Sequence, residues 1–171
     1  MGLLLRRIAA YLLDILLLFA VLAPLGQVIL RLLGQTPSSG PEIALTILWN
    51  FSLPVWLYFA AGDCSAGGAT LGKRLLRIQV RTERGEQVRL GRALARTAVK
   101  LLPWELTHIS AFALSADLTA LGPLQVAGIA LANLLALSYL VVAIATGGRR
   151  SVHDYLAATA VRAAPAADAP T

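Results

Sequence analysis

The feature that most constrains this chain is a long apolar run from Ile8 to Leu30, in which Asp14 is the only charged residue. As an α-helix rising about 1.5 Å per residue, the run is long enough to cross a hydrocarbon core about 30 Å thick. Two further uncharged runs extend over 43–61 and 123–146. Only 14% of the chain is charged, against about 25% in soluble domains. The sequence therefore predicts an all-α membrane protein.

The basic residues are distributed unevenly. Of the 15 Lys and Arg, only Arg31 falls between the first two apolar runs. The others form three groups: Arg6 and Arg7, the stretch 73–100, and the tail with Arg149, Arg150 and Arg162. Loops rich in Lys and Arg stay on the cytoplasmic side of a membrane. We therefore expect both termini to be cytoplasmic, which requires an even number of spans.

The segment 97–115 determines whether that number is four. It is apolar, but it contains four interrupting residues: Lys100, Pro103, Glu105 and His108. This pattern predicts either a fourth span or a helix in the membrane plane followed by a re-entrant segment. The even count favours about four spans, with the third short and tilted. In the second span, Pro54 predicts a kink because proline has no backbone N–H to donate.

Residues 67–76, GGATLGKRLL, come close to a phosphate-binding loop. That loop needs a strand before it and a Ser or Thr after the lysine to hold magnesium. Here an apolar run precedes the glycines, and Arg74 follows Lys73. We instead expect a turn followed by a short amphipathic helix at the membrane interface. Its basic patch consists of Lys73, Arg74, Arg77 and, from the next helix, Arg92.

Alternating apolar residues on either side of Gly85 predict a small cytoplasmic β-hairpin, with Ile78 and Val80 in one strand and Val88 and Leu90 in the other. Two strands alone are only marginally stable. A third strand is expected from residues 159–161. Arg92, Arg96 and Lys100 then recur every four residues, which places them on one stripe of a helix.

Three blocks of the sequence together resemble the RDD family of bacterial membrane proteins: RRIAAYLLD at 6–14, TLGKRLLRIQVRTERGEQVRLGRALAR at 70–96, and HDYLAATAV at 153–161. The resemblance implies a single membrane domain over 1–162, followed by a disordered Ala/Pro-rich tail at 163–171. It also implies a bacterial inner (plasma) membrane location. The family's named arginine would be Arg7 or Arg6, and its two aspartates Asp14 and Asp154.

Asp14 lies several residues inside the first span, where an unpaired charge is costly. Arg7 is on the same face but leans away from it, toward the helix N-terminus. We therefore expect a cation from another element, Arg96 first and then Lys100 or His108. Asp14 would then be either a structural pin or an ion-linked carboxylate, and the sequence leaves both open. The predicted charge network consists of Arg7, Asp14, Arg96 and Asp154.

Two histidines stand beside acidic residues. Glu105 and His108 share a helix face, which favours a satisfied polar pin, because a di-iron bundle needs a second such pair and two more glutamates. His153 and Asp154 follow Ser151, and this pattern predicts a capping box with Asp154 at its third position. We expect no metal, no cofactor and no catalytic residues.

Two functions follow as expectations. The first is a non-enzymatic accessory or assembly subunit of a membrane complex. The alternative is an ion or small-solute transporter, resembling a cation/proton antiporter, with Asp14 as its coupling carboxylate and a homo-oligomeric state. Expected partners are anionic lipid headgroups and other membrane subunits or further copies of the chain. Nucleic acid is not expected, since the basic loop lacks stacking aromatics.

Overall fold

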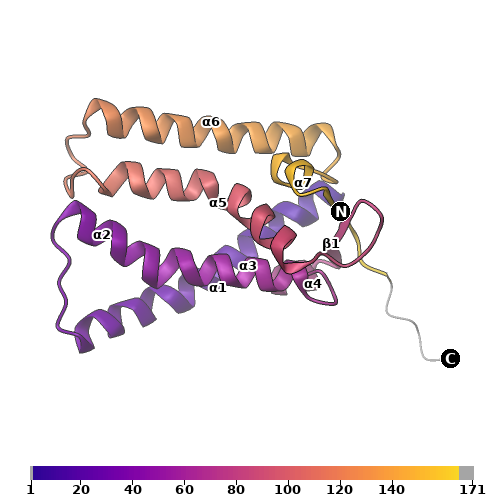
Figure 1. Cartoon of the computed structure of the whole chain (residues 1–171), viewed down its shortest axis with the longest axis horizontal. Coiled ribbons are helices and arrows are strands. Elements are labelled where there is room, and N and C mark those ends of the chain that lie inside the picture. Colours follow the sequence, from indigo (N-terminus) through magenta and orange to yellow (C-terminus); the bar gives the residue numbers. More distant parts are fainter. Residues whose placement is uncertain (1, 166–171) are drawn as a thin grey trace.

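A computed structural model describes residues 2–165. Four long helical rods lie roughly side by side, and short elements gather at one end, near the N-terminus (Figure 1). The rods are α1 (Leu3–Leu32), the continuous segment α2–η1–α3 (Gly40–Ile47, Leu48–Ser52, Leu53–Cys64), α5 (Leu90–Phe112) and α6 (Pro123–Ala145). The short elements are α4 (Leu71–Leu75), β1 (Ile78–Thr82), α7 (Val152–Leu156) and β2 (Thr159–Ala163). We call the end that carries these short elements the charged end.

Three helical segments of the described chain are long and apolar enough to cross a membrane: Leu3–Leu32, Gly40–Cys64 and Pro123–Ala145. They confirm the three long apolar runs predicted as spans. Helix α5 is as long as α6 and lies beside it (Figure 1), but it does not meet the same criteria of composition. The fourth span therefore stays a prediction.

Two contacts show how closely α5 packs against α6. A Cβ added to Gly128 would lie 2.1 Å from Ser110 Oγ, so the two helices approach where α6 has no side chain. Toward the charged end, the Tyr139 hydroxyl donates a 2.9 Å hydrogen bond to the Val99 carbonyl. The pairings 110 with 128 and 99 with 139 make the helices antiparallel.

Near Pro54, where a kink is expected, the helix contains a π-helical turn, η1, which ends two residues before the proline. Pro54 lies in the first turn of α3, where its missing N–H leaves a gap in the helical ladder. The wider turn keeps α2, η1 and α3 continuous. At the other end of the rod, Ser39 and Glu42 form a capping box that starts α2.

The sheet corrects one prediction. Strand β1 pairs antiparallel with β2, with Val80 opposite Val161, and not with residues after Gly85. Gly85 does sit in a turn, with φ +89°, and Thr82 N donates to Glu86 O at 3.0 Å. Beyond that turn the chain buries Val88 and enters α5. The predicted hairpin is therefore wrong, while the strand expected at 159–161 is confirmed.

Strand β2 extends to Ala163, the first residue of the expected tail, and Ala164 N donates to Arg77 O at 2.9 Å. The rest of that expectation falls mainly on residues 166–171, which lie outside the described part of the chain.

Candidate functional site

Asp14 is almost completely buried, with 1% of its surface exposed, and it receives three hydrogen bonds from neutral donors. Tyr58 Oη donates to Oδ1 at 2.5 Å, Thr70 Oγ1 donates to Oδ2 at 2.5 Å, and Gly72 N donates to Oδ1 at 2.8 Å. The predicted pairing of Asp14 with Arg96 is wrong. The Tyr58 hydroxyl of α3, the Thr70 hydroxyl directly before α4 and the Gly72 amide in the first turn of α4 take the place of that cation.

The glycine of the Gly72–Lys73 pair is needed for close packing. A Cβ on Gly72 would lie 2.3 Å from the Ala10 carbonyl oxygen and 3.0 Å from the Asp14 carboxylate. Only glycine lets this turn approach α1 closely enough for its N–H to reach Asp14. The motif therefore fastens α4 to α1, and Asp14 occupies the space next to its amide.

The prediction that Lys73 belongs to an exposed basic patch is wrong. Its side chain is buried, and its Nζ forms an ion pair with Asp63, the penultimate residue of α3. Arg74, Arg77 and Arg92 are exposed, as expected. Helix α4 has one outward side with Leu71 and Leu75 and one inward side with Gly72 and Lys73. Lys73 faces inward because a buried carboxylate lies there.

Asp63 is the residue that the sequence analysis missed. It is completely buried and also forms an ion pair with Arg96 Nη1. It lies two residues beyond the apolar run that ends at Ala61, between that run and the turn expected at residues 67–76. A carboxylate directly after a membrane run, in a chain whose next loop is basic, was the signal available for finding it.

Asp154 is the second carboxylate that binds Arg96. Arg96 Nη2 lies 2.9 Å from Asp154 Oδ1, and Arg7 Nη2 pairs with Oδ2. Ser151 N also donates to Oδ2 at 2.8 Å, which confirms the predicted capping box. Burial alone raises the pKa of Asp154, but Arg96 and then Arg7 outweigh it and hold that pKa below its ordinary value.

The ion pairs thus form one continuous network that joins α1, α3, α4, α5 and α7: Arg7, Asp154, Arg96, Asp63 and Lys73. Of the predicted network, the structure brings Arg7, Arg96 and Asp154 together. Asp14 lies beside this network through the Gly72 turn rather than within it.

His153 lies against the same network. Its Nε2 is 2.7 Å from Arg7 Nη2, a donor, so this nitrogen accepts and the proton of the neutral ring is on Nδ1. Burial, and next the nearby Arg96, lower the pKa of His153 well below its ordinary value. Its Nδ1 is buried with no hydrogen-bond partner among residues 2–165.

Glu105 and His108 lie in the half of α5 that is further from the charged end, and each has its own hydrogen-bond partners. Glu105 accepts hydrogen bonds from Ser52 Oγ at 2.9 Å and Trp56 Nε1 at 3.0 Å, so it joins α5 to the second rod. His108 Nδ1 lies 3.0 Å from the Trp104 carbonyl, one helical turn earlier. The expected polar pin is therefore present at Glu105, and it connects two rods.

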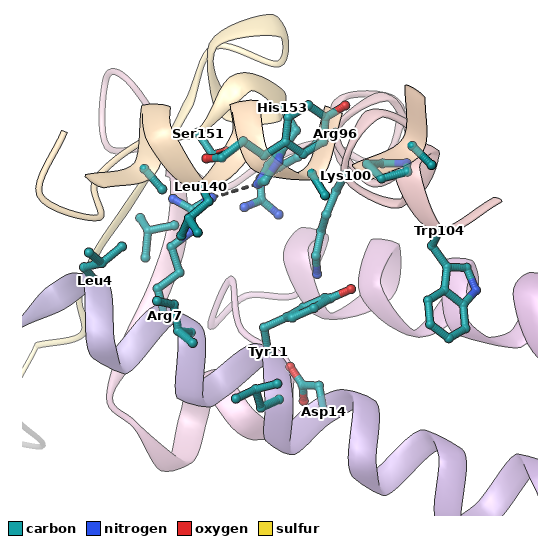
Figure 2. Close-up of a pocket in the computed structure, with 18 of the residues that line it drawn as sticks. Leu4, Arg7, Tyr11, Asp14, Arg96, Lys100, Trp104, Leu140, Ser151 and His153 are labelled. Atoms are coloured by element: carbon teal, nitrogen blue, oxygen red, sulfur yellow. Dashed lines mark hydrogen bonds between the residues drawn. The ribbon is translucent and has the colours of Figure 1, made fainter. Parts of the chain in front are cut away.

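A cavity of about 440 Å³ lies beside the network, between α1, α5 and α6. In Figure 2, Lys100 extends from α5 toward Tyr11 of α1, with Asp14 one turn further along that helix. Lys100 Nζ lies 3.1 Å from the centre of the Phe59 ring and 4.8 Å from that of Tyr11. Arg7, Arg96 and His153 line the same cavity.

Long apolar helices, with a buried charge network at one end of the bundle, define an integral membrane protein. The chain belongs to the RDD family, whose model matches residues 1–158. That match covers all three blocks that carried the resemblance, apart from the last residues of the third. No curated protein sequence and no solved structure matches the chain.

Proposed function

We propose that this RDD family protein is a non-enzymatic accessory or assembly subunit of a membrane complex. One observation carries the proposal: the protein's own donors occupy every carboxylate of the buried cluster. Asp14 receives three hydrogen bonds, Asp63 binds two cations, and Asp154 binds two cations and a backbone amide. A carboxylate that binds a transported cation must exchange its partners during each cycle. These carboxylates instead join five elements into one rigid end, as an assembly body requires.

The helix surfaces support the same proposal. In α1 and α6, only 11% of the most apolar window is buried within the chain. The remaining surface contacts lipid or other membrane helices. Ion pairs fix one end of the bundle, while the spans of the same chain stay largely uncovered. Those spans can therefore pack against another subunit or against a second copy of the chain.

A transporter is the second candidate, and a specific observation favours it: Asp14 borders the cavity between α1, α5 and α6. In that function a proton or cation would reach Asp14 through the cavity and displace one of its three donors. The Tyr58 and Thr70 hydroxyls are the donors that can rotate away, whereas the Gly72 amide is fixed by the backbone.

Purification of the full chain in mild detergent, followed by native mass spectrometry, tests the assembly role. A homo-oligomer or a membrane partner in fixed ratio is expected. The matched variant is Leu137→Lys, on the exposed side of α6 away from the cavity, and it should dissociate an assembly made through that side. A strictly monomeric chain in lipid nanodiscs and in detergent would contradict the assembly role.

We also propose that the charged end faces the cytoplasm of a bacterial cell, because 14 of the 15 Lys and Arg belong to the three basic groups and only Arg31 lies apart. In a Cys64→Ser background, a cysteine at Ser39 should react with an impermeant maleimide added outside. A cysteine at Arg84, in the turn after β1, should react only after lysis. The reverse pattern would overturn this orientation.

A further inference from the structure

The cavity between α1, α5 and α6 borders the ion-pair network, and none of the ion pairs described above fills it. It lies within the range of about 300–1,000 Å³ that small-ligand pockets occupy, and its volume is about 440 Å³. Its wall near the network is polar, with Arg7 and Lys100, whereas Leu12 and Leu140 border it on the membrane helices. Leu12 is 53% exposed and Leu140 is 43% exposed. The cavity therefore opens sideways, through the gap between α1 and α6, to the lipid-facing surface.

The charges around the cavity do not balance. Four cations face three carboxylates in the buried cluster: Arg7, Lys73, Arg96 and Lys100 against Asp14, Asp63 and Asp154. Counted in their ordinary ionised forms, they leave one positive charge in excess. Buried charges are costly unless they are paired. In that count, one anion in the cavity would balance the cluster.

Lys100 is the cation of this cluster that has no carboxylate within ion-pair distance among residues 2–165. Arg7, Lys73 and Arg96 each have a carboxylate within ion-pair distance. No ion pair or hydrogen bond joins Lys100 Nζ to any other residue in the described range 2–165, and the ammonium lies over the faces of Phe59 and Tyr11. Figure 2 shows the side chain extending into the space between α5 and α1. An anion that enters the cavity would meet an ammonium that is held by aromatic faces and by no carboxylate of the described residues.

We propose that the cavity binds one anionic phospholipid, with its phosphate on Lys100 and an acyl chain in the gap between α1 and α6. The phosphate supplies the missing negative charge at the charged end. The acyl chain covers the apolar wall formed by Leu12, Pro103, Ala136 and Leu140. A basic pocket between membrane helices is a known kind of site for anionic headgroups. A soluble anion would leave that apolar wall uncovered. The proposal stands whether or not the chain assembles with partners.

The test uses the full chain, purified and delipidated in detergent. Its unfolding temperature is measured with added phosphatidylglycerol, with phosphatidylcholine of the same chain length, and with inorganic phosphate. Native mass spectrometry counts the bound lipid. We expect one phosphatidylglycerol per chain and stabilisation by that lipid alone. Stabilisation by inorganic phosphate to the same extent would instead indicate a soluble anion. Equal stabilisation by both lipids would show that binding does not depend on the net charge of the headgroup. Either result overturns the proposal.

Two pairs of variants locate the site. Lys100→Gln should weaken phosphatidylglycerol binding about tenfold or more, the usual effect of losing a charge-assisted hydrogen bond. Arg84→Gln, which removes an exposed cation in the turn after β1 and outside the basic patch, should leave binding unchanged and so controls for the loss of one positive charge. Ala136→Trp should block the acyl part of the cavity without altering any charge, whereas Leu137→Trp lies on α6 outside it.

If Lys100→Gln does not fold, Ala136→Trp against Leu137→Trp decides the question alone. Retained one-to-one binding in Ala136→Trp would overturn the proposal, and so would a folded Lys100→Gln protein that binds the lipid as tightly as the original chain. Loss in both site variants, with both controls intact, supports it.

Discussion

The backbone amide of Gly72 donates a 2.8 Å hydrogen bond to the carboxylate of Asp14, and the missing side chain of Gly72 makes that bond possible. The contact joins α4 to the first membrane helix, at a point 58 residues away in sequence. It gives the glycine–lysine pair a structural explanation without a nucleotide. The glycine packs on α1, and the lysine forms an ion pair with Asp63 of α3.

Gly72→Ala should therefore destabilise the protein. The added methyl group would lie 2.3 Å from the Ala10 carbonyl oxygen, so α4 must move away from α1 and stretch the bond to Asp14. Overpacking of this kind costs about 1–3 kcal/mol. Gly67→Ala, in the turn that precedes α4, is the control, because its Cβ would meet nothing within 4 Å. Thermal unfolding in detergent measures both. Equal unfolding temperatures for the two variants would contradict this explanation of the motif.

The ion pair between Asp63 and Lys73 should be strongly coupled. Asp63→Asn leaves Lys73 and Arg96 with one carboxylate fewer, and breaking a buried pair costs about 3–5 kcal/mol. Lys73→Met should also destabilise, but the double variant should lose clearly less than the sum. The exposed pair Glu83–Arg150 is the control, and Glu83→Gln should cost less than about 1 kcal/mol. Strict additivity at Asp63 and Lys73 would mean that they are not partners.

Stability should fall in two stages as the pH is lowered. His153 stays neutral in the fold because burial lowers its pKa well below the usual value near 6.5, so the unfolded chain binds its proton first. Stability is therefore complete above about pH 6.5 and declines below it. A second decline should begin near pH 4, because Arg96 and Arg7 outweigh burial and keep the pKa of Asp154 low. His153→Gln should remove the first stage only. Denaturant midpoints measured from pH 8 to pH 3 give the profile, and a first stage unchanged in His153→Gln would refute the assignment.

The membrane spans could be predicted because hydrophobic length is a local property. Each of the three long apolar runs lies in a helical segment that is long and apolar enough to cross a membrane. The capping box at Ser151 and Asp154 was also predictable, since it depends on residues three apart. The β-pairing was not, because Val88 and Val161 both offer an apolar alternating pattern to β1. The choice of Val161 depends on where α5 begins and α7 ends.

The partners of the buried charges were the least predictable part. The sequence indicated that Asp14 needed a partner and that Arg96 was near its level, and joining them was the simplest arrangement. In the structure Arg96 turns to Asp63 and Asp154, while neutral donors bind Asp14. Hydroxyl and backbone donors leave no charge signal in a sequence. For that reason a search for opposite charges could not find Tyr58, Thr70 or Gly72.

The central claim is that Asp14 is a structural acceptor held by three donors, and Asp14→Asn tests it most directly. The purified variant should be less stable than the original chain by about 1–3 kcal/mol, because one acceptor is lost while the donors stay buried. In the same preparation, proton movement driven by a cation gradient is measured in proteoliposomes. The account predicts that both proteins match empty liposomes. Flux in the original chain that disappears in Asp14→Asn, with stability unchanged, would contradict it and make Asp14 a transport site.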